Sequence, residues 1–379
     1  MMKVATCGNY QMSLLLKNFL KGTNIDVTNF IADQTELQRG GGGEIPLITF
    51  DDFKNMICKN VIDGIIITDL HHVTPFSKSA VNLLKFHDIP LIGVTQFSYP
   101  PIIRKPTDII YWLDSDKDYA AYIETHVISS CNLNCKGCGH FSPLFNDNDF
   151  YEINSFKRDI RRISENLDLI TLRLLGGEPL LKKDLADYIK IARHYLKKTT
   201  IRIVTNGLLI PSLPQNLLDT IRENDVIFDI SLYSPTMKIF DKIKSILEKN
   251  EIAYNNDILY HLQRKSEIKT FVKRMLRHGT SNPGKSLAYC RTRQECRFLR
   301  AGKLYKCPMD ALVYRFTENF KINDFPKSMG IDIHASNFLP LFHQLEEMPI
   351  DLCRWCLEGD YQDFEWKAPS KRVKEEWLV

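Results

Sequence analysis

The sequence predicts an α/β protein whose first region is a Rossmann-like doubly wound parallel sheet and whose second is a partial (β/α)6 barrel. Two observations predict this class: short β-rich runs alternate with amphipathic stretches over residues 1–96, and the same alternation returns over residues 124–255. Between them, residues 97–122 carry Pro100, Pro101 and Pro106 and then an acidic run, as a connector would. We place the domain boundaries at 1–115, 116–285 and 286–379, the last part being small and rich in cysteine.

The first region shows strand-like runs separated by helix-like ones. The expected strands are 3–7, 26–31, 47–49, 64–68 and 90–94, and the expected helices 12–20, 50–58 and 79–87. Ligands bind such sheets at the carboxyl ends of the strands, where Cys7-Gly8-Asn9 follows the first strand; a tight turn is the alternative. Neither G-x-G-x-x-G nor a G-K-[ST] loop is present, so dinucleotide or ATP binding is not predicted. Cys58, on an apolar helix face, is expected in the core.

Composition and the lack of targeting signals indicate the cellular compartment in which the protein is expected. The chain has 379 residues, 44% of them hydrophobic, and a net charge of +4. No signal peptide and no apolar run long enough to span a bilayer is visible. Ten cysteines without an export signal predict metal and catalytic use in a reducing cytoplasm and not disulfides.

Three cysteines follow the strand expected at 124–130. Cys131, Cys135 and Cys138 have C-x3-C-x2-C spacing, short enough for one loop to hold a single centre. A [4Fe–4S] cluster is ordinarily held by four cysteines, so three would leave one iron open. His140 offers a fourth ligand, which makes a structural zinc site the alternative.

A second motif follows the next expected strand. Gly176-Gly177-Glu178-Pro179 ends the run Leu172–Leu175; the glycines permit close approach to the backbone, and Glu178 can accept a hydrogen bond from an ammonium. Together, the two motifs resemble those of the radical SAM superfamily. The resemblance implies that S-adenosylmethionine (SAM) chelates the open iron, that the Gly-Gly-Glu-Pro motif binds its amino group, and that reductive cleavage yields a 5′-deoxyadenosyl radical. Finding both motifs disfavours zinc.

The rest of the barrel repeats the strand–helix pattern. The expected helices are 153–166, 182–198, 214–223 and 238–249, and the further strands 201–205, 226–232 and 252–255. The resemblance implies that Asn206 and Ser231 contact the SAM ribose and carboxylate, although each could be a turn or capping residue. Many relatives carry an aromatic residue before the third cysteine. Here Gly137 stands there, which leaves backbone contact to adenine but no ring stacking.

Residues 261–300 are strongly basic, with eleven Lys or Arg residues against Glu267 and Glu295. A solvated helix face is one explanation. The other is an anionic ligand such as a phosphorylated substrate, a nucleotide-linked sugar or RNA.

Five more cysteines lie toward the C-terminus: Cys290, Cys296, Cys307, Cys353 and Cys356. A hairpin is expected over 298–306, turning at Ala-Gly-Lys and ending in G-x4-C. This arrangement resembles the SPASM/twitch extension of radical SAM enzymes, which implies one auxiliary [4Fe–4S] cluster; a zinc ribbon is the alternative. Four ligand positions leave one thiol, Cys290 or Cys296, as a possible hydrogen donor.

These observations predict a radical SAM oxidoreductase or epimerase acting on a small, anionic carbohydrate or nucleotide-sugar. Radical modification of a peptide or RNA is a second hypothesis. A non-catalytic iron–sulfur or zinc scaffold protein is a third. The expected partners are a phosphorylated or nucleotide-linked small molecule and an electron donor such as flavodoxin or ferredoxin. No membrane partner is expected, and nucleic acid is disfavoured but not excluded.

Overall fold

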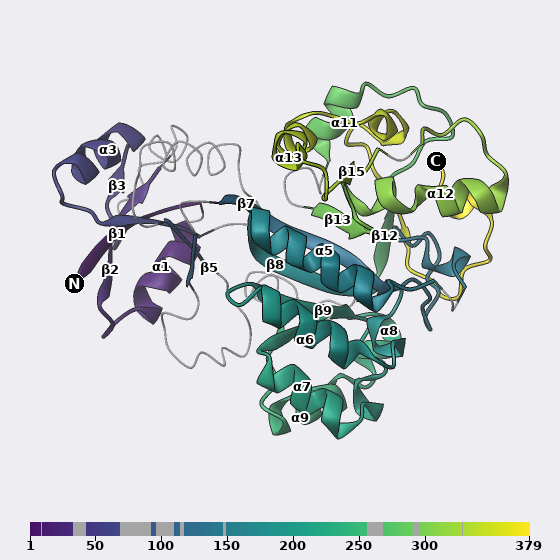
Figure 1. Cartoon of the computed structure of the whole chain (residues 1–379), viewed down its shortest axis with the longest axis horizontal. Coiled ribbons are helices and arrows are strands. Elements are labelled where there is room, and N and C mark those ends of the chain that lie inside the picture. Colours follow the sequence, from purple (N-terminus) through teal and green to yellow (C-terminus); the bar gives the residue numbers. More distant parts are fainter. Residues whose placement is uncertain are drawn as a thin grey trace. The chain divides into compact units, whose positions relative to one another are not determined.

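The computed structural model describes residues 1–8, 10–32, 43–68, 92–95, 110–113, 117–146, 149–255, 268–290, 296–327 and 329–379. The chain divides into two compact units (Figure 1). The first comprises Met1–Phe97 with Ile103–Tyr119, and the second Ser98–Ile102 with Ala120–Val379. A separation of the second unit into barrel and auxiliary domain stays a prediction. None of the helices in these ranges is long and apolar enough to cross a membrane.

The first unit is built on a six-stranded sheet of order β3-β2-β1-β4-β5-β6. Its strands are β1 (Met2–Cys7), β2 (Ile25–Ile31), β3 (Leu47–Ile48), β4 (Gly64–Ile67), β5 (Ile92–Thr95) and β6 (Ile110–Trp112). All pairs are parallel except β5–β6, which is antiparallel. The order around β1 confirms the doubly wound sheet, and α1 (Tyr10–Phe19) and α3 (Phe50–Cys58) match two of the expected helices.

Two expectations for this region are wrong. Cys58 is exposed and not in the core, because α3 ends there and its buried residue is Phe53, on another face of the helix. The connector also contains packed structure: β6 pairs with β5, and β7 (Asp118–Ile128) begins inside it. Cys7 is fully buried and Gly8 has φ +108°, as the turn interpretation requires. Asn9 and the helix expected at 79–87 lie outside the described residues.

The second unit contains an eight-stranded sheet of order β11-β10-β9-β8-β7-β13-β14-β15. After β7 come β8 (Leu167–Gly176), β9 (Thr200–Thr205), β10 (Val226–Ile230), β11 (Tyr254–Asn255), β13 (Cys296–Arg300), β14 (Lys303–Tyr305) and β15 (Ile331–Asp332). The pairs β7–β13, β8–β9, β9–β10 and β10–β11 are parallel, which fits the predicted partial barrel. The expected hairpin is present as β13–β14, with Ala301 and Gly302 both at positive φ in its turn.

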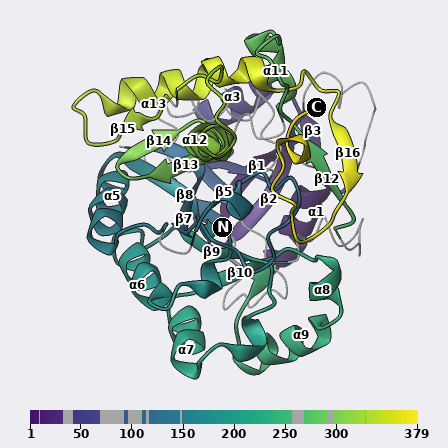
Figure 2. The same cartoon turned by 90° about the vertical axis from the view of Figure 1, so that its right-hand side faces the viewer.

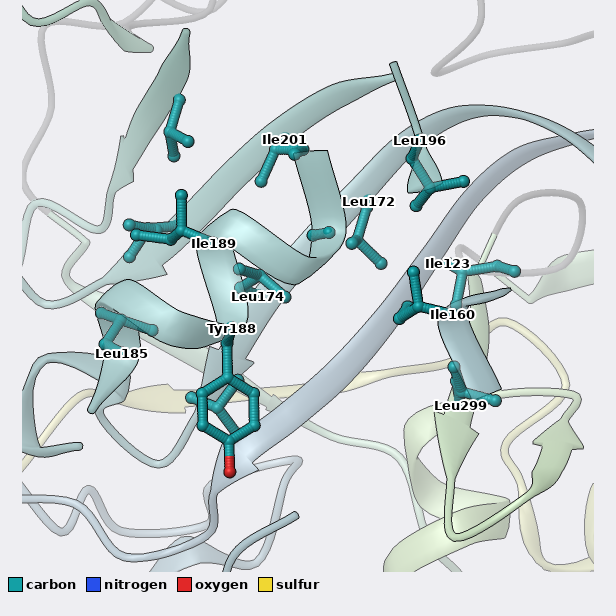
Figure 3. Close-up of a cluster of buried hydrophobic side chains, with 14 of the residues drawn as sticks. Ile123, Ile160, Leu172, Leu174, Leu185, Tyr188, Ile189, Leu196, Ile201 and Leu299 are labelled. Carbon is teal, nitrogen blue, oxygen red and sulfur yellow. The ribbon is translucent and has the colours of Figure 1, made fainter. Parts of the chain in front are cut away.

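Helices cover one face of this sheet. In Figure 2, α5 (Ile153–Asn166), α6 (Leu185–Tyr195), α7 (Gln215–Glu223) and α9 (Phe240–Lys249) follow one another along the outside of the strands. Leucine and isoleucine side chains from both layers form the core, with Tyr188 and Ile189 of α6 against Leu172, Leu174 and Ile201 of the strands (Figure 3). Alternate strand residues therefore face away from the helices.

The C-terminal part adds α11 (Pro283–Tyr289), α12 (Pro308–Phe320), α13 (Phe338–Glu347) and a two-stranded antiparallel sheet of β12 (Thr270–Lys273) and β16 (Gln362–Glu365). A second hydrophobic core forms here. It joins Phe141 and Phe145, just after the cysteine loop, to Phe298, Phe316 and Trp377. The loop that follows β7 is thus packed against the end of the chain.

Candidate functional site

The three cysteines of the C-x3-C-x2-C motif lie on one loop just beyond the carboxyl end of β7. We call residues 131–138 the cysteine loop. Cys135 is buried, and Cys131 and Cys138 are half-buried. Asn134 and Gly137 have φ +50° and +61°, so the loop turns tightly twice between its thiols. Cys138 N–H donates to Cys135 O at 3.3 Å.

Burial makes these thiols poor acids in the absence of a positive partner. It raises the pKa of Cys131 to about 11 and that of Cys135 to about 12. A metal centre that accepts thiolates would offset this cost. Within the described ranges no three His, Cys, Asp or Glu side chains converge as ligands of a single ion. A [4Fe–4S] cluster binds each of its cysteines at a different iron, and three thiols on one short loop are compatible with such a cluster.

His140, the fourth ligand of the zinc alternative, has another partner. Its Nδ1 lies 2.9 Å from Nε2 of His126 in β7, and the two rings stack with centroids 5.1 Å apart. Ser129 Oγ approaches Nδ1 of His126 at 3.3 Å and donates to Asp149 at 2.8 Å. His140 therefore belongs to a partly buried polar network beside the loop.

The glycines of the second motif bring the ends of β7 and β8 together. A Cβ on Gly176 would lie 1.9 Å from Ile128 O, and one on Gly177 2.2 Å from Ser130 O. The N–H groups of Gly177 and Glu178 donate to those same two carbonyls. The lack of a Cβ at both glycines thus allows the chain itself to approach closely, which fixes the start of the cysteine loop; approach by a ligand stays a prediction.

Glu178 is fully buried and already accepts three hydrogen bonds. Its Oε1 takes Thr205 Oγ1 at 2.6 Å and Leu180 N–H at 3.1 Å, and its Oε2 takes Asn206 N–H at 2.9 Å. Burial raises its pKa to about 7, against the lowering effect of these donors. A carboxylate has about four acceptor positions, so roughly one remains for a ligand. Pro179 begins the short 3-10 turn that Glu178 caps.

Asn206 connects the end of β9 to the cysteine loop. Its Nδ2 donates to Asn132 Oδ1 at 2.8 Å and lies 3.9 Å from Cys131 Sγ. Ser231 follows β10, and its N–H donates to Thr205 O at 2.9 Å. The structure thus brings Glu178, Asn206 and the first cysteine together at neighbouring strand ends. The assignment of Asn206 and Ser231 to SAM stays a prediction.

Four C-terminal cysteines come close together. The pKa of the Cys356 thiol is raised to about 12 by burial and then by the neighbouring Cys353 and Cys290 thiols. Burial also raises the pKa of Cys307, with Asp310, Cys356 and Cys290 adding to the effect. Cys290, at the end of α11, is therefore a neighbour of the other three. The side chain of Cys296 is outside the described part of the structure.

Three members of the basic stretch have partners on other elements. Arg297 is buried and lies 3.4 Å from Glu346. Arg300 pairs with Asp149 at 2.7 Å, and Lys273 Nζ donates to Leu378 O at 2.9 Å. Arg264, Lys265, Arg291 and Arg293 are outside the described residues. Arg297, Arg300 and Lys273 thus hold different elements together.

Sequence reasoning missed an ion-pair network on the sheet face opposite the helices. Leu172 and Leu174 pack in the core beneath the helices, so Arg173 between them faces the other way. Its guanidinium donates to Glu124 of β7 at 3.2 Å and to Asp229 of β10 at 3.1 Å. The sequence did contain a signal for this network, namely a single charged residue, Arg173, between the apolar residues of a barrel strand. Only the strand register shows that three such charges meet.

Comparison with known proteins gives the following likenesses. Residues 125–263 match the model of the Radical SAM superfamily. The chain is 29% identical over 140 residues to GTP 3',8-cyclase of Helicobacter pylori, covering 36% of this chain and 44% of that protein. It is 29% identical over 153 residues to GTP 3',8-cyclase of Synechocystis, covering 40% and 45% respectively. The chain thus spans less than half the length of these relatives.

Among solved structures, BtrN in complex with AdoMet and 2-DOIA is similar over 63% of this chain and 94% of its own, at 17% identity and a TM-score of 0.39. Native anSMEcpe with bound AdoMet is similar over 36% of this chain and 43% of its own, at 15% identity and a TM-score of 0.30.

Proposed function

Residues 125–263 are a radical SAM domain, and from this premise we propose that Cys131, Cys135 and Cys138 hold a [4Fe–4S] cluster with one open iron. The observation that carries the proposal is the meeting of this loop with Glu178 and Asn206 at neighbouring strand ends. When bound, the cluster and SAM supply a 5′-deoxyadenosyl radical that abstracts hydrogen from a substrate. Flavodoxin or ferredoxin would supply the electron.

The chain's own residues would hold and orient SAM. Glu178 has one acceptor position left for the SAM ammonium, while its other bonds fix the ends of β8 and β9. Asn206, Ser231 and the backbone of Gly137 are the further proposed contacts. Tight packing around Gly176 and Gly177 fixes the ends of β7 and β8, which would help to orient SAM toward the open iron.

We propose that the substrate is a small anionic carbohydrate or nucleotide-linked sugar that is dehydrogenated or epimerised. The network of Arg173, Glu124 and Asp229 supports a polar substrate, because it places charged groups on the sheet face away from the helices. The GTP 3',8-cyclase relatives favour a second candidate, a purine nucleotide. A nucleotide-linked sugar and a purine nucleotide both carry phosphate, whereas a peptide need not.

The experiment that tests the proposal is SAM cleavage by the anaerobically reconstituted protein. Changing Cys131, Cys135 and Cys138 together to Ala should remove about half of an expected eight irons per chain and all cleavage. Cleavage that persists in the triple variant would refute the assignment. Stimulation of cleavage by nucleotide-sugars or GTP, compared with peptides and RNA, then separates the substrate classes, and no cleavage in the wild-type protein would favour the scaffold alternative.

We further propose that an auxiliary [4Fe–4S] cluster is held by Cys290, Cys307, Cys353 and Cys356. The support is that Ser286 Oγ of α11 donates to Cys356 O at 3.0 Å and that Cys356 N–H donates to Cys353 O at 3.2 Å, which places α11 beside this pair of cysteines. Burial and the neighbouring thiols raise the pKa values of Cys307 and Cys356. Cys296 is then the remaining thiol and the candidate hydrogen donor.

A further inference from the structure

The end of the chain binds the cysteine loop directly. We call residues 362–379 the C-terminal tail. Lys136 N–H donates to Lys367 O at 2.8 Å, and Ser370 N–H donates to Asn134 O at 2.7 Å. Trp377 Nε1–H donates to Cys138 O at 2.8 Å. These three bonds join the tail to the backbone between the cysteines.

A fourth bond reaches a thiol. Trp366 Nε1 lies 3.2 Å from Sγ of Cys135, the most buried of the three cysteines, and its N–H is directed at the sulfur. This is a side chain-to-sulfur bond between residues far apart in the sequence. An indole N–H is only a donor, so the bond requires sulfur as the acceptor.

Trp366 is held in place through its backbone and through its ring. The backbone N–H of Trp366 donates to Lys269 O at 2.8 Å, extending the antiparallel pairing of β16 with β12. Its ring stacks on Tyr233, with centroids 5.2 Å apart and planes 17° apart. Tyr233 follows β10, two residues after Ser231, so the stack fixes the indole against the same strand ends that meet the cysteine loop.

Gly137 fits the loop to the tail. A Cβ at this position would lie 2.6 Å from Cζ of Phe364 and 2.7 Å from Glu376 O, both in the tail. Lys136 Nζ also lies 5.3 Å from the centroid of the Phe364 ring. An aromatic residue before the third cysteine has no room here because the tail occupies that space.

We propose that Trp366 is a positioning residue of the radical SAM cluster: its indole N–H donates to the thiolate of Cys135 and raises the reduction potential of the cluster. This inference rests on the proposed function, since it requires Cys135 to ligate iron. Hydrogen bonds to ligating sulfur are among the features that set the potential of an iron–sulfur cluster. Reduction adds one electron, and the donor stabilises the more negative state more strongly.

The test compares two tryptophans in the reconstituted holoenzyme. Trp366→Phe removes the donor to sulfur but keeps an aromatic ring against Tyr233. Trp377→Phe removes a donor to the carbonyl of Cys138 and is the matched control. The midpoint potential is measured by redox titration, following the electron paramagnetic resonance signal that changes when SAM is added, which identifies the cluster with the open iron.

We expect Trp366→Phe to give a more negative midpoint potential with wild-type iron content, and Trp377→Phe to give a smaller shift. An unchanged potential in Trp366→Phe, or an equal shift in both variants, overturns the inference while leaving the proposed function standing. If the wild-type protein shows no cluster whose signal responds to SAM, both the inference about Trp366 and the proposed function are overturned.

A second measurement covers the case in which Trp366→Phe does not fold or bind iron. The Trp377→Phe protein is labelled with 15N in its indole nitrogens and reduced. Electron–nuclear double resonance should detect coupling between an indole 15N and the SAM-responsive cluster, as a donor 3.2 Å from a ligating sulfur requires. Absence of this coupling overturns the inference.

Discussion

The ionisation of Glu178 should be visible in SAM binding. Burial raises its pKa to about 7, so its carboxyl is neutral below that pH and ionised above it. Only the ionised form attracts the SAM ammonium as a charge. We therefore expect the Kd for SAM to fall about tenfold between about pH 6 and about pH 7.5, since a hydrogen bond to a charged group contributes roughly 1.5–3 kcal/mol.

The control is Glu178→Gln, which cannot ionise over this range. Its Kd should be higher than that of the wild-type protein at about pH 7.5 and should vary little with pH. Binding isotherms by equilibrium dialysis at several pH values measure both. If the variant kept the wild-type pH dependence, another group would be responsible, and Glu178 would only join the ends of β8 and β9.

For single residues, the sequence predicts a site when the residues that form it are contiguous, and it does not when they come from distant parts of the chain. The cysteine loop and Gly176-Gly177-Glu178 are contiguous motifs, so they could be found without a structure. The contact of Arg173 with Glu124 and Asp229 could not, because it depends on the register of three strands. Trp366 lies in the tail, and its bond to Cys135 follows from a pairing of β12 with β16 that no local pattern indicates.

At the scale of elements, the segment from α11 to β13 carries the next prediction, because it contains Cys290 and Cys296. Cys290 follows α11 and caps it near Cys353 and Cys356, so Cys290→Ser should lose about four of eight irons per chain. Cys296→Ala should keep all of them. Iron analysis and the electron paramagnetic resonance of both variants measure this, and loss of iron from both would leave neither thiol free.

The same pair of variants separates the two proposed reactions. An epimerase must return a hydrogen atom to the substrate radical, and a free thiol can donate it. If the reaction is epimerisation, turnover in D2O should place deuterium on the product carbon, and Cys296→Ala should stop turnover with its iron intact. A dehydrogenase needs no such donor, so full turnover by Cys296→Ala would favour oxidation.

The elements themselves were predictable where their hydrophobic period was clear. The bounds of α3 and α5 match those expected, since each has a continuous amphipathic pattern. The hairpin of β13 and β14 was predictable from its turn residues. In contrast, β12 and β16 are short and pair across a long stretch of chain, and β6 lies in a proline-rich segment whose composition indicated a connector.

At the scale of the whole molecule, the proposed iron sites all belong to one of the two compact units. Cys7 and Cys58 are the only cysteines in the first unit, and neither is a proposed ligand. Each unit also has a hydrophobic core of its own: Val4, Phe30 and Ile66 belong to the first, and Leu172, Phe228 and Leu299 to the second. Iron should therefore stabilise the second unit, because a ligand stabilises the state that binds it.

Anaerobic removal of iron should accordingly raise amide hydrogen exchange in β7, β8 and the tail while leaving β1 and β2 unchanged. The tail should respond because Trp366 and Trp377 bond to the cysteine loop, whose conformation the cluster would fix. By calorimetry, each 1 kcal/mol lost should lower the Tm of the second unit by about 2–4 °C. Mass spectrometry of peptides from both units measures the exchange. Equal increases of exchange in β1 and β7 would show that iron stabilises the chain as a whole. Unchanged exchange in the tail would show that the conformation of the tail does not depend on the cluster.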